Sequence, residues 1–93
     1  METKGIHKDI RKELLSRLKK VEGQVRGVYR MIEEERNCGE IVIQLAAIKS
    51  AVNRVGFSVL GCHLASCIEE GISRGNEPEQ SLAEFMSVLK KFS

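Results

Sequence analysis

The sequence predicts an all-α protein built from three helices. Apolar residues in the first third of the chain recur at helical spacing. Aromatic residues make up only 4% of the chain and Trp is absent, so Ala, Ile, Leu and Val supply most of the hydrophobic content. That composition suits helix packing better than a sheet sandwich. We therefore expect a long antiparallel helix hairpin followed by a short C-terminal helix, in a single domain over residues 1–93.

The first helix is expected over about residues 9–36, with Asp9 as its N-cap. Its apolar residues follow steps of three and four, which is a heptad-like stripe. Gly23 and Gly27 interrupt the helix at a cost of about 1 kcal/mol each relative to Ala, so we expect them to admit a neighbouring helix. The stripe consists of Ile10, Leu14, Leu18, Val21, Val25, Val28 and Ile32.

The second helix is expected over about residues 39–72, after a very short connection. Asn37, followed three residues later by Glu40, resembles a capping box. Residues 41–60 are apolar around most of the helix circumference, and such a helix must be covered on nearly all sides. The first helix covers one flank only, so the sequence predicts that copies of the chain assemble.

The third helix is expected over about residues 77–91. Gly71 and Gly75 should close the second helix, and Asn76 should cap the third, with Pro78 in its first turn. Leu82, Phe85, Met86 and Leu89 share one face of this helix. We expect that face to pack back on the bundle.

Charge is distributed unevenly along the chain. Residues 1–30 contain nine Lys and Arg against four acidic residues, whereas residues 31–93 contain six against nine. The resulting +5 is either an ordinary solvated helix face or, when repeated in an oligomer, a surface that attracts phosphates. No segment resembles a signal peptide or a run of about 18 apolar residues, so we expect a cytoplasmic protein with no membrane partner and with reduced cysteines.

Cys38, His63 and Cys67 form the pattern with the most chemical content. His63 and Cys67 are four residues apart, so both lie on one face of the second helix. Cys38 precedes His63 by 25 residues, which is about 37 Å along a straight helix. One ion therefore contacts all three residues only if a second copy of the chain supplies part of the site.

Small residues near the midpoint of that interval favour an antiparallel dimer. A two-fold axis near residue 50 or 51 would bring Cys38 of one copy to His63 and Cys67 of the other. The small residues are Ala46, Ala47, Ser50 and Ala51. Two thiolates and one imidazole suit Cu(I), or Zn(II) with a fourth ligand, and Cu(I) is favoured because no fourth ligand is evident. The alternative is that these residues have structural roles only.

Two long segments, SRLKKVEGQVRGVYRMIEEERNC and IVIQLAAIKSAVNRVGFSVLGCHLASC, resemble the copper-sensing operon repressor family (CsoR/RcnR). The resemblance implies a trigonal Cu(I) site, one Cu(I) per protomer, formed by Cys38 of one protomer and His63 with Cys67 of its partner. It also implies dimeric four-helix bundles that pair into a homotetramer. Such a protein represses transcription by binding operator DNA in the apo form, and Cu(I) releases the DNA.

The resemblance extends to further residues. Glu84 matches a carboxylate that accepts a hydrogen bond from the ligand histidine. Asn37 stands where relatives often have Tyr, so that part of the surroundings differs. The residues that resemble the family's DNA-binding positions, or adjoin them, are Arg17, Lys19, Lys20, Lys49 and Arg54. No helix-turn-helix pattern is present, so recognition would rest on phosphate contacts and DNA shape.

Cys62 and His7 lie outside the family pattern, and we interpret them as a packing residue and a solvated residue. Two other functions remain open. Relatives that sense persulfide or sulfite use the same two cysteines, although they lack the histidine, and a copper-buffering protein could use the same three ligands. We do not expect an enzyme or a small-molecule substrate, because no oxyanion hole or substrate pocket is indicated.

Overall fold

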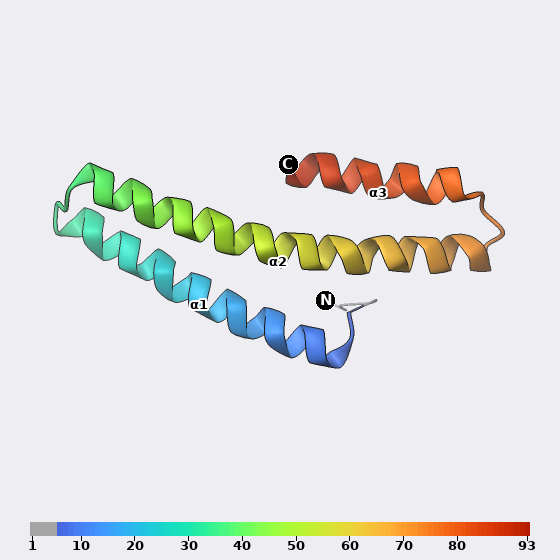
Figure 1. The fold of residues 1–93 in the computed structure, drawn as a ribbon, viewed down its shortest axis with the longest axis horizontal. Coiled ribbons are helices and arrows are strands. Elements are labelled where there is room, and N and C mark those ends of the chain that lie inside the picture. Colours follow the sequence, from blue (N-terminus) through green and yellow to red (C-terminus); the bar gives the residue numbers. More distant parts are fainter. Residues whose placement is uncertain (1–5) are drawn as a thin grey trace. The chain divides into compact units, whose positions relative to one another are not determined.

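The computed structural model describes residues 6–93 and contains three helices: α1 (Lys8–Glu33), α2 (Cys38–Ser73) and α3 (Pro78–Phe92) (Figure 1). No strand occurs in this described range, so the predicted all-α fold class is confirmed. The chain divides into two compact units. Residues 8–55 form one unit, and residues 56–93, with residues 6 and 7, form the other. Helix α2 contributes to both.

In the unit of residues 8–55, α1 runs antiparallel to the first part of α2 (Figure 1). Leu14 and Val28 of the predicted stripe are buried, as is Val55. Leu18 and Val25 of the same stripe are 45% and 50% exposed. With Ile32, three of the seven stripe residues are exposed, so the stripe is wider than one neighbouring helix covers.

Helix α1 ends at Glu33, three residues before the predicted end, because the chain reverses in a Schellman turn. The Arg36 N–H donates to the Met31 carbonyl (2.9 Å) and the Glu35 N–H donates to the Ile32 carbonyl (3.1 Å). Glu35 occupies the left-handed region of this turn, with φ of 56°. Glutamate is unfavourable there, since its Cβ lies close to the following carbonyl oxygen.

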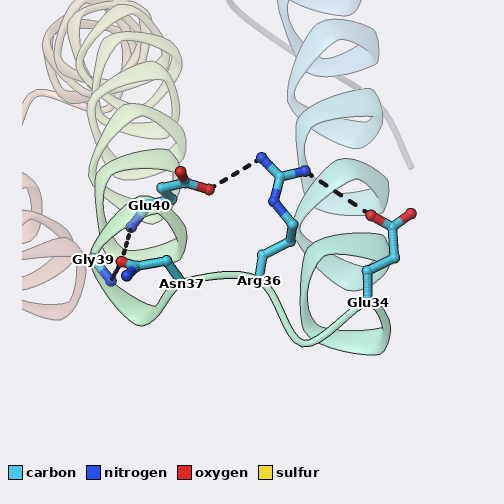
Figure 2. Close-up of polar contacts among 5 residues, drawn as sticks. All are labelled: Glu34, Arg36, Asn37, Gly39 and Glu40. Atoms are coloured by element: carbon cyan, nitrogen blue, oxygen red, sulfur yellow. Dashed lines mark hydrogen bonds and ion pairs between the residues drawn. The ribbon is translucent and has the colours of Figure 1, made fainter.

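The start of α2 is fixed by side chains (Figure 2). Asn37 Oδ1 accepts hydrogen bonds from the backbone N–H groups of Gly39 (2.8 Å) and Glu40 (3.3 Å), so the predicted cap is confirmed. The reciprocal bond of a capping box is absent among these described residues. The Glu40 carboxylate instead accepts from Arg36 Nη2 at 3.0 Å, and Arg36 Nη1 lies 3.9 Å from Glu34.

A second Schellman turn closes α2. The Asn76 N–H donates to the Gly71 carbonyl (2.7 Å) and the Gly75 N–H donates to the Ile72 carbonyl (3.1 Å). Gly75 supplies the positive φ of 74°, as the sequence suggested. Gly71, in contrast, lies inside the helix and is buried against Ser81 of α3.

Two predicted N-caps are wrong. Helix α1 begins at Lys8, so Asp9 lies within the first turn, where its charge still favours the positive end of the helix dipole. Helix α3 is preceded by Glu77, which has extended backbone angles and makes no side-chain cap bond. Asn76 is unavailable as its cap because its backbone completes the turn that ends α2. Pro78 begins the helix, as expected.

In the unit of residues 56–93, α3 packs along the second part of α2 (Figure 1). Leu60 and Cys67 are buried there. Near the end of α3, Phe92 lies directly against Gly56, and its ring meets Phe57 edge-on with centroids 5.8 Å apart. The third helix therefore returns onto its predecessor, but the predicted face packs only in part: Phe85 and Leu89 are half-buried, whereas Leu82 and Met86 are 54% and 43% exposed.

The single chain leaves much of its apolar surface uncovered. Among the described residues, no large side chain is fully buried, while Val42, Ile43 and Ile72 are more than 60% exposed. Helix α2 is also long and apolar enough, by length and composition, to cross a membrane, with a mean hydropathy of 1.2 over 18 residues. Core helices of oligomeric proteins have the same composition. Exposed apolar area of this extent marks an interface.

Candidate metal site and nucleic-acid interface

His63 and Cys67 lie together on the part of α2 that belongs to the unit of residues 56–93. Cys67 Sγ is 3.5 Å from His63 Nε2 and 3.8 Å from Nδ1. Bond lengths of about 2.3 Å to sulfur and 2.0 Å to nitrogen put two ligands of one ion roughly 3.5–3.7 Å apart. The pair therefore has the spacing of two donors to a shared metal ion, as the i, i+4 pattern suggested.

Helix α3 covers this pair. The rings of His63 and Phe85 have centroids 6.3 Å apart. Burial raises the pKa of the Cys67 thiol above its ordinary value, and the carboxylates of Glu84 and Glu70 raise it further. A bound cation would offset both effects by stabilising the thiolate. The site thus consists of a thiol and an imidazole beneath an aromatic ring, with acidic groups close by.

Cys38 is the first residue of α2 and is exposed. It belongs to the unit of residues 8–55, whereas His63 and Cys67 belong to the other. Within residues 6–93 of one chain, no three His, Cys, Asp or Glu side chains gather to hold a metal ion. The donor chemistry fits a soft cation such as Cu(I), but the described chain brings only two of the three predicted ligands together.

The other candidates around this site differ in environment. Among the described residues, Glu84 makes no hydrogen bond to His63, and its carboxylate acts on Cys67 instead. Cys62 is half-buried in the second part of α2, directly before His63. His7 is exposed just before α1.

A polar groove of about 510 Å³ lies between α1 and the first part of α2, within the unit of residues 8–55. Three of the five predicted DNA-binding residues line it: Arg17 and Lys20 from α1, and Arg54 from α2. Lys19 and Lys49 are exposed but lie outside its lining. The groove therefore concentrates positive charge on one face of the helix pair.

The small residues of α2 also line this groove. Ala47, Ser50 and Ala51 form part of its wall, so within the described single chain they face α1. Gly23 and Gly27 of α1, in contrast, have no atom within 4 Å of where a Cβ would stand, apart from the helix itself. Their predicted close neighbour is therefore absent from the described single chain.

Two participants were missed by the sequence analysis. Glu13 lines the groove and forms an ion pair with Arg17, with 2.8 Å between Glu13 Oε1 and Arg17 Nη2. The acid followed four residues later by Arg was the available signal. The sequence places Phe85 only on the packing face of α3, and its position over His63 depends on how α3 returns along α2.

Comparison with known proteins identifies the family to which this chain is similar. Residues 10–91 match the family described as metal-sensitive transcriptional repressors. The copper-sensing transcriptional repressor CsoR of Bacillus subtilis is 37% identical over 87% of this chain and 79% of its own length. The copper-sensing transcriptional repressor RicR of Mycobacterium tuberculosis is 42% identical over 81% of this chain and 79% of its own length.

Solved structures agree. The copper-sensing repressor CsoR with Cu(I) from Geobacillus thermodenitrificans superposes with a TM-score of 0.79 at 41% identity, covering 94% of this chain and 90% of that one. The nickel-responsive transcriptional regulator InrS superposes with a TM-score of 0.74 at 40% identity, covering 88% and 91%. The chain therefore belongs to the family of metal-sensitive transcriptional repressors, of the CsoR type, which act on DNA and are not enzymes.

Proposed function

We propose that this protein is a Cu(I)-responsive repressor, with a site made by Cys38 of one protomer and by His63 and Cys67 of its partner. The observation that carries the proposal is the 3.5 Å approach of Cys67 Sγ to His63 Nε2, since it presents two soft donors to one ion. Bound Cu(I) supplies a soft cation that joins the three side chains. One ion per protomer gives two equivalent sites in an antiparallel dimer.

The exposed apolar surface of α2 supports assembly. Val42, Ile43 and Phe57 each remain more than 60% exposed in the single chain, which is costly unless another copy covers them. A dimer that shares two metal sites, and a pairing of dimers into a tetramer, repeats the basic groove on the surface. A cytoplasmic location agrees with this function.

The two halves of α2 would have different tasks. Arg17, Lys20 and Arg54 of the groove contact operator DNA in the apo form, with Lys19 and Lys49 on adjoining surface. His63 and Cys67 bind the metal beneath α3, and Glu84 of α3 accepts a hydrogen bond from the His63 imidazole in the metal-bound state. Metal binding then favours an assembly whose basic faces match DNA less well, which is negative coupling between the two sites.

The direct test follows copper and DNA together. A labelled duplex selected by the apo protein from a random-sequence library is titrated with Cu(I), while thiolate-to-copper absorption is recorded. C38A should bind the duplex as tightly as wild type and should remain bound when Cu(I) is added. C62A is the matched control and should release DNA normally. Release of DNA from C38A at wild-type Cu(I) concentrations would exclude this site.

Nickel is the second candidate effector, because the InrS structure is so similar. The thiolate pair favours Cu(I), the softer ion. In the same assay, stoichiometric Ni(II) should therefore leave the duplex bound. Release by Ni(II) and not by Cu(I) would reassign the effector while leaving the repressor function intact.

A further inference from the structure

The groove between α1 and α2 contains one acidic side chain among its cationic ones. Arg17 donates to Glu13 from two of its N–H groups, at 2.8 Å from Nη2 and 3.2 Å from Nε, and both reach the same oxygen, Oε1. Lys20 and Arg54 line the same groove, and the described structure gives them no ion-pair partner. Arg17 is thus the one cation of the groove whose charge is already partly neutralised.

The geometry leaves Arg17 able to bind a second anion. Glu13 occupies the edge formed by Nε and Nη2, so the end formed by Nη1 and Nη2 keeps free donors for a phosphate. A phosphate held there would lie close to the Glu13 carboxylate, which is bound to the same guanidinium, and like charges repel. The side chains of Arg17 and Glu13 are 42% and 60% exposed, so water and salt screen this repulsion to a moderate strength.

We propose that Glu13 is a built-in competitor for DNA phosphate, which holds Arg17 in one orientation and weakens the groove's salt-dependent attraction for DNA. This inference rests on the proposed DNA-binding role of the groove and adds the residue that sets its strength. Because the competition acts on phosphate and not on bases, it lowers affinity for every DNA sequence by a similar factor. It thereby limits retention of the protein on non-operator DNA.

E13Q isolates the charge, since glutamine keeps an oxygen that accepts from Arg17. The probe is a mixed-sequence 30-base-pair duplex, and the affinity of the apo protein is measured by fluorescence anisotropy across a KCl series. E13Q should tighten binding roughly two- to fivefold for each groove engaged, the range expected for an exposed ion pair. The plot of log K against log[KCl] should steepen by about 0.9 per groove, because one more cation releases counterions.

E22Q is the matched control. Glu22 is exposed on α1 and lies outside the groove. It follows Glu13 by nine residues, which puts it on the opposite side of the helix. The E22Q substitution changes the net charge by the same amount as E13Q and should have little effect on DNA binding. In an R17Q background, the additional change from glutamate to glutamine at position 13 should also have little effect, because Glu13 acts through Arg17.

The outcomes distinguish a failure of the role inferred for Glu13 from a failure of the proposed DNA-binding role of the groove. If wild-type protein binds the duplex and R17Q weakens binding, but E13Q matches E22Q, then Glu13 is not a competitor and the inference is overturned. An equal gain from E13Q with and without Arg17 would overturn it as well, since that result reports net charge alone. If wild type and R17Q both fail to bind DNA, the groove's role in the proposed function fails first.

Discussion

The two connections between helices share one backbone design and differ in their side chains. Both end a helix with a Schellman turn, at Glu35 after α1 and at Gly75 after α2. The first then continues into a helix capped by Asn37, whereas the residue that caps α3, Glu77, makes no side-chain bond. The helix that follows the first turn therefore begins with side-chain hydrogen bonds, whereas the helix that follows the second turn begins without any.

The two neighbouring helices are accordingly attached to α2 by different kinds of contact. Arg36 links Glu34 at the end of α1 to Glu40 at the start of α2, around the capped turn (Figure 2). Helix α3 depends instead on packing, through contacts of Phe92 with Gly56 and of Ser81 with Gly71. The helix that covers His63 and Cys67 is thus attached by packing, without a side-chain hydrogen bond at the start of the helix.

The largest expected effect is at Gly75. G75A places a Cβ at a φ of 74°, which should lower the free energy of unfolding by about 1–2 kcal/mol. Urea unfolding at fixed protein concentration measures it. E35A is the matched control at the equivalent position of the first turn. It should change stability by less than about 0.5 kcal/mol, because one L-residue replaces another. Equal losses at both turns would contradict the comparison.

Asn37 should come next. N37A removes the acceptor for two backbone N–H groups at the start of α2, at a cost of about 1 kcal/mol. E77A, at the corresponding position before α3, removes no cap bond and should be nearly neutral. N37D should retain most of the wild-type stability, as aspartate caps equally well. A neutral N37A would show that the cap contributes nothing to the first connection.

E35G, in the first turn, should raise the free energy of unfolding where the preceding substitutions lower it. Glycine relieves the left-handed strain but adds freedom to the unfolded chain, so a net gain of about 0.5–1 kcal/mol is expected. Thermal unfolding should shift upward by a few degrees. A loss of stability would mean that the Glu35 side chain makes a compensating contact in the assembled protein.

The smallest effect should be at Arg36. Its partners Glu34 and Glu40 are more than half exposed, so R36Q should cost no more than about 0.5 kcal/mol at low salt. Repeating the unfolding in 1 M NaCl should remove the difference between R36Q and wild type. A difference that persists in high salt would indicate packing by the arginine stem and not charge.

Much of the fold followed from the sequence because its signals are local. Helix periodicity, the Asn37 cap and the glycine turn at Gly75 each depend on residues within a few positions of one another. The cap of α3 was misassigned to Asn76 because the preceding turn claims that residue's backbone, and two adjacent signals compete for it. Whether Asn76 ends α2 or caps α3 depends on the backbone conformation of the whole turn, which the identity of one residue does not predict.

Only part of the candidate site can be predicted from the sequence, because the rest depends on contacts between residues far apart in the chain. The spacing of His63 and Cys67 placed both donors on one helix face, which the structure reproduces at 3.5 Å. Phe85 over His63 depends on how α3 returns, and the pairing of Glu13 with Arg17 depends on side-chain rotamers in the groove. The proposed role of Cys38 requires a partner chain, so this part of the site rests on the argument from helix length.

Subunit mixing tests the shared site most directly. C38A and H63A are denatured, mixed in equal amounts and refolded together, and Cu(I) binding is followed by thiolate-to-copper absorption. In an antiparallel dimer each mixed pair rebuilds one complete site from Cys38 of one chain and His63 with Cys67 of the other. Random pairing should therefore restore about a quarter of wild-type sites. A mixture that binds no more Cu(I) than the two variants refolded separately would contradict the intersubunit site.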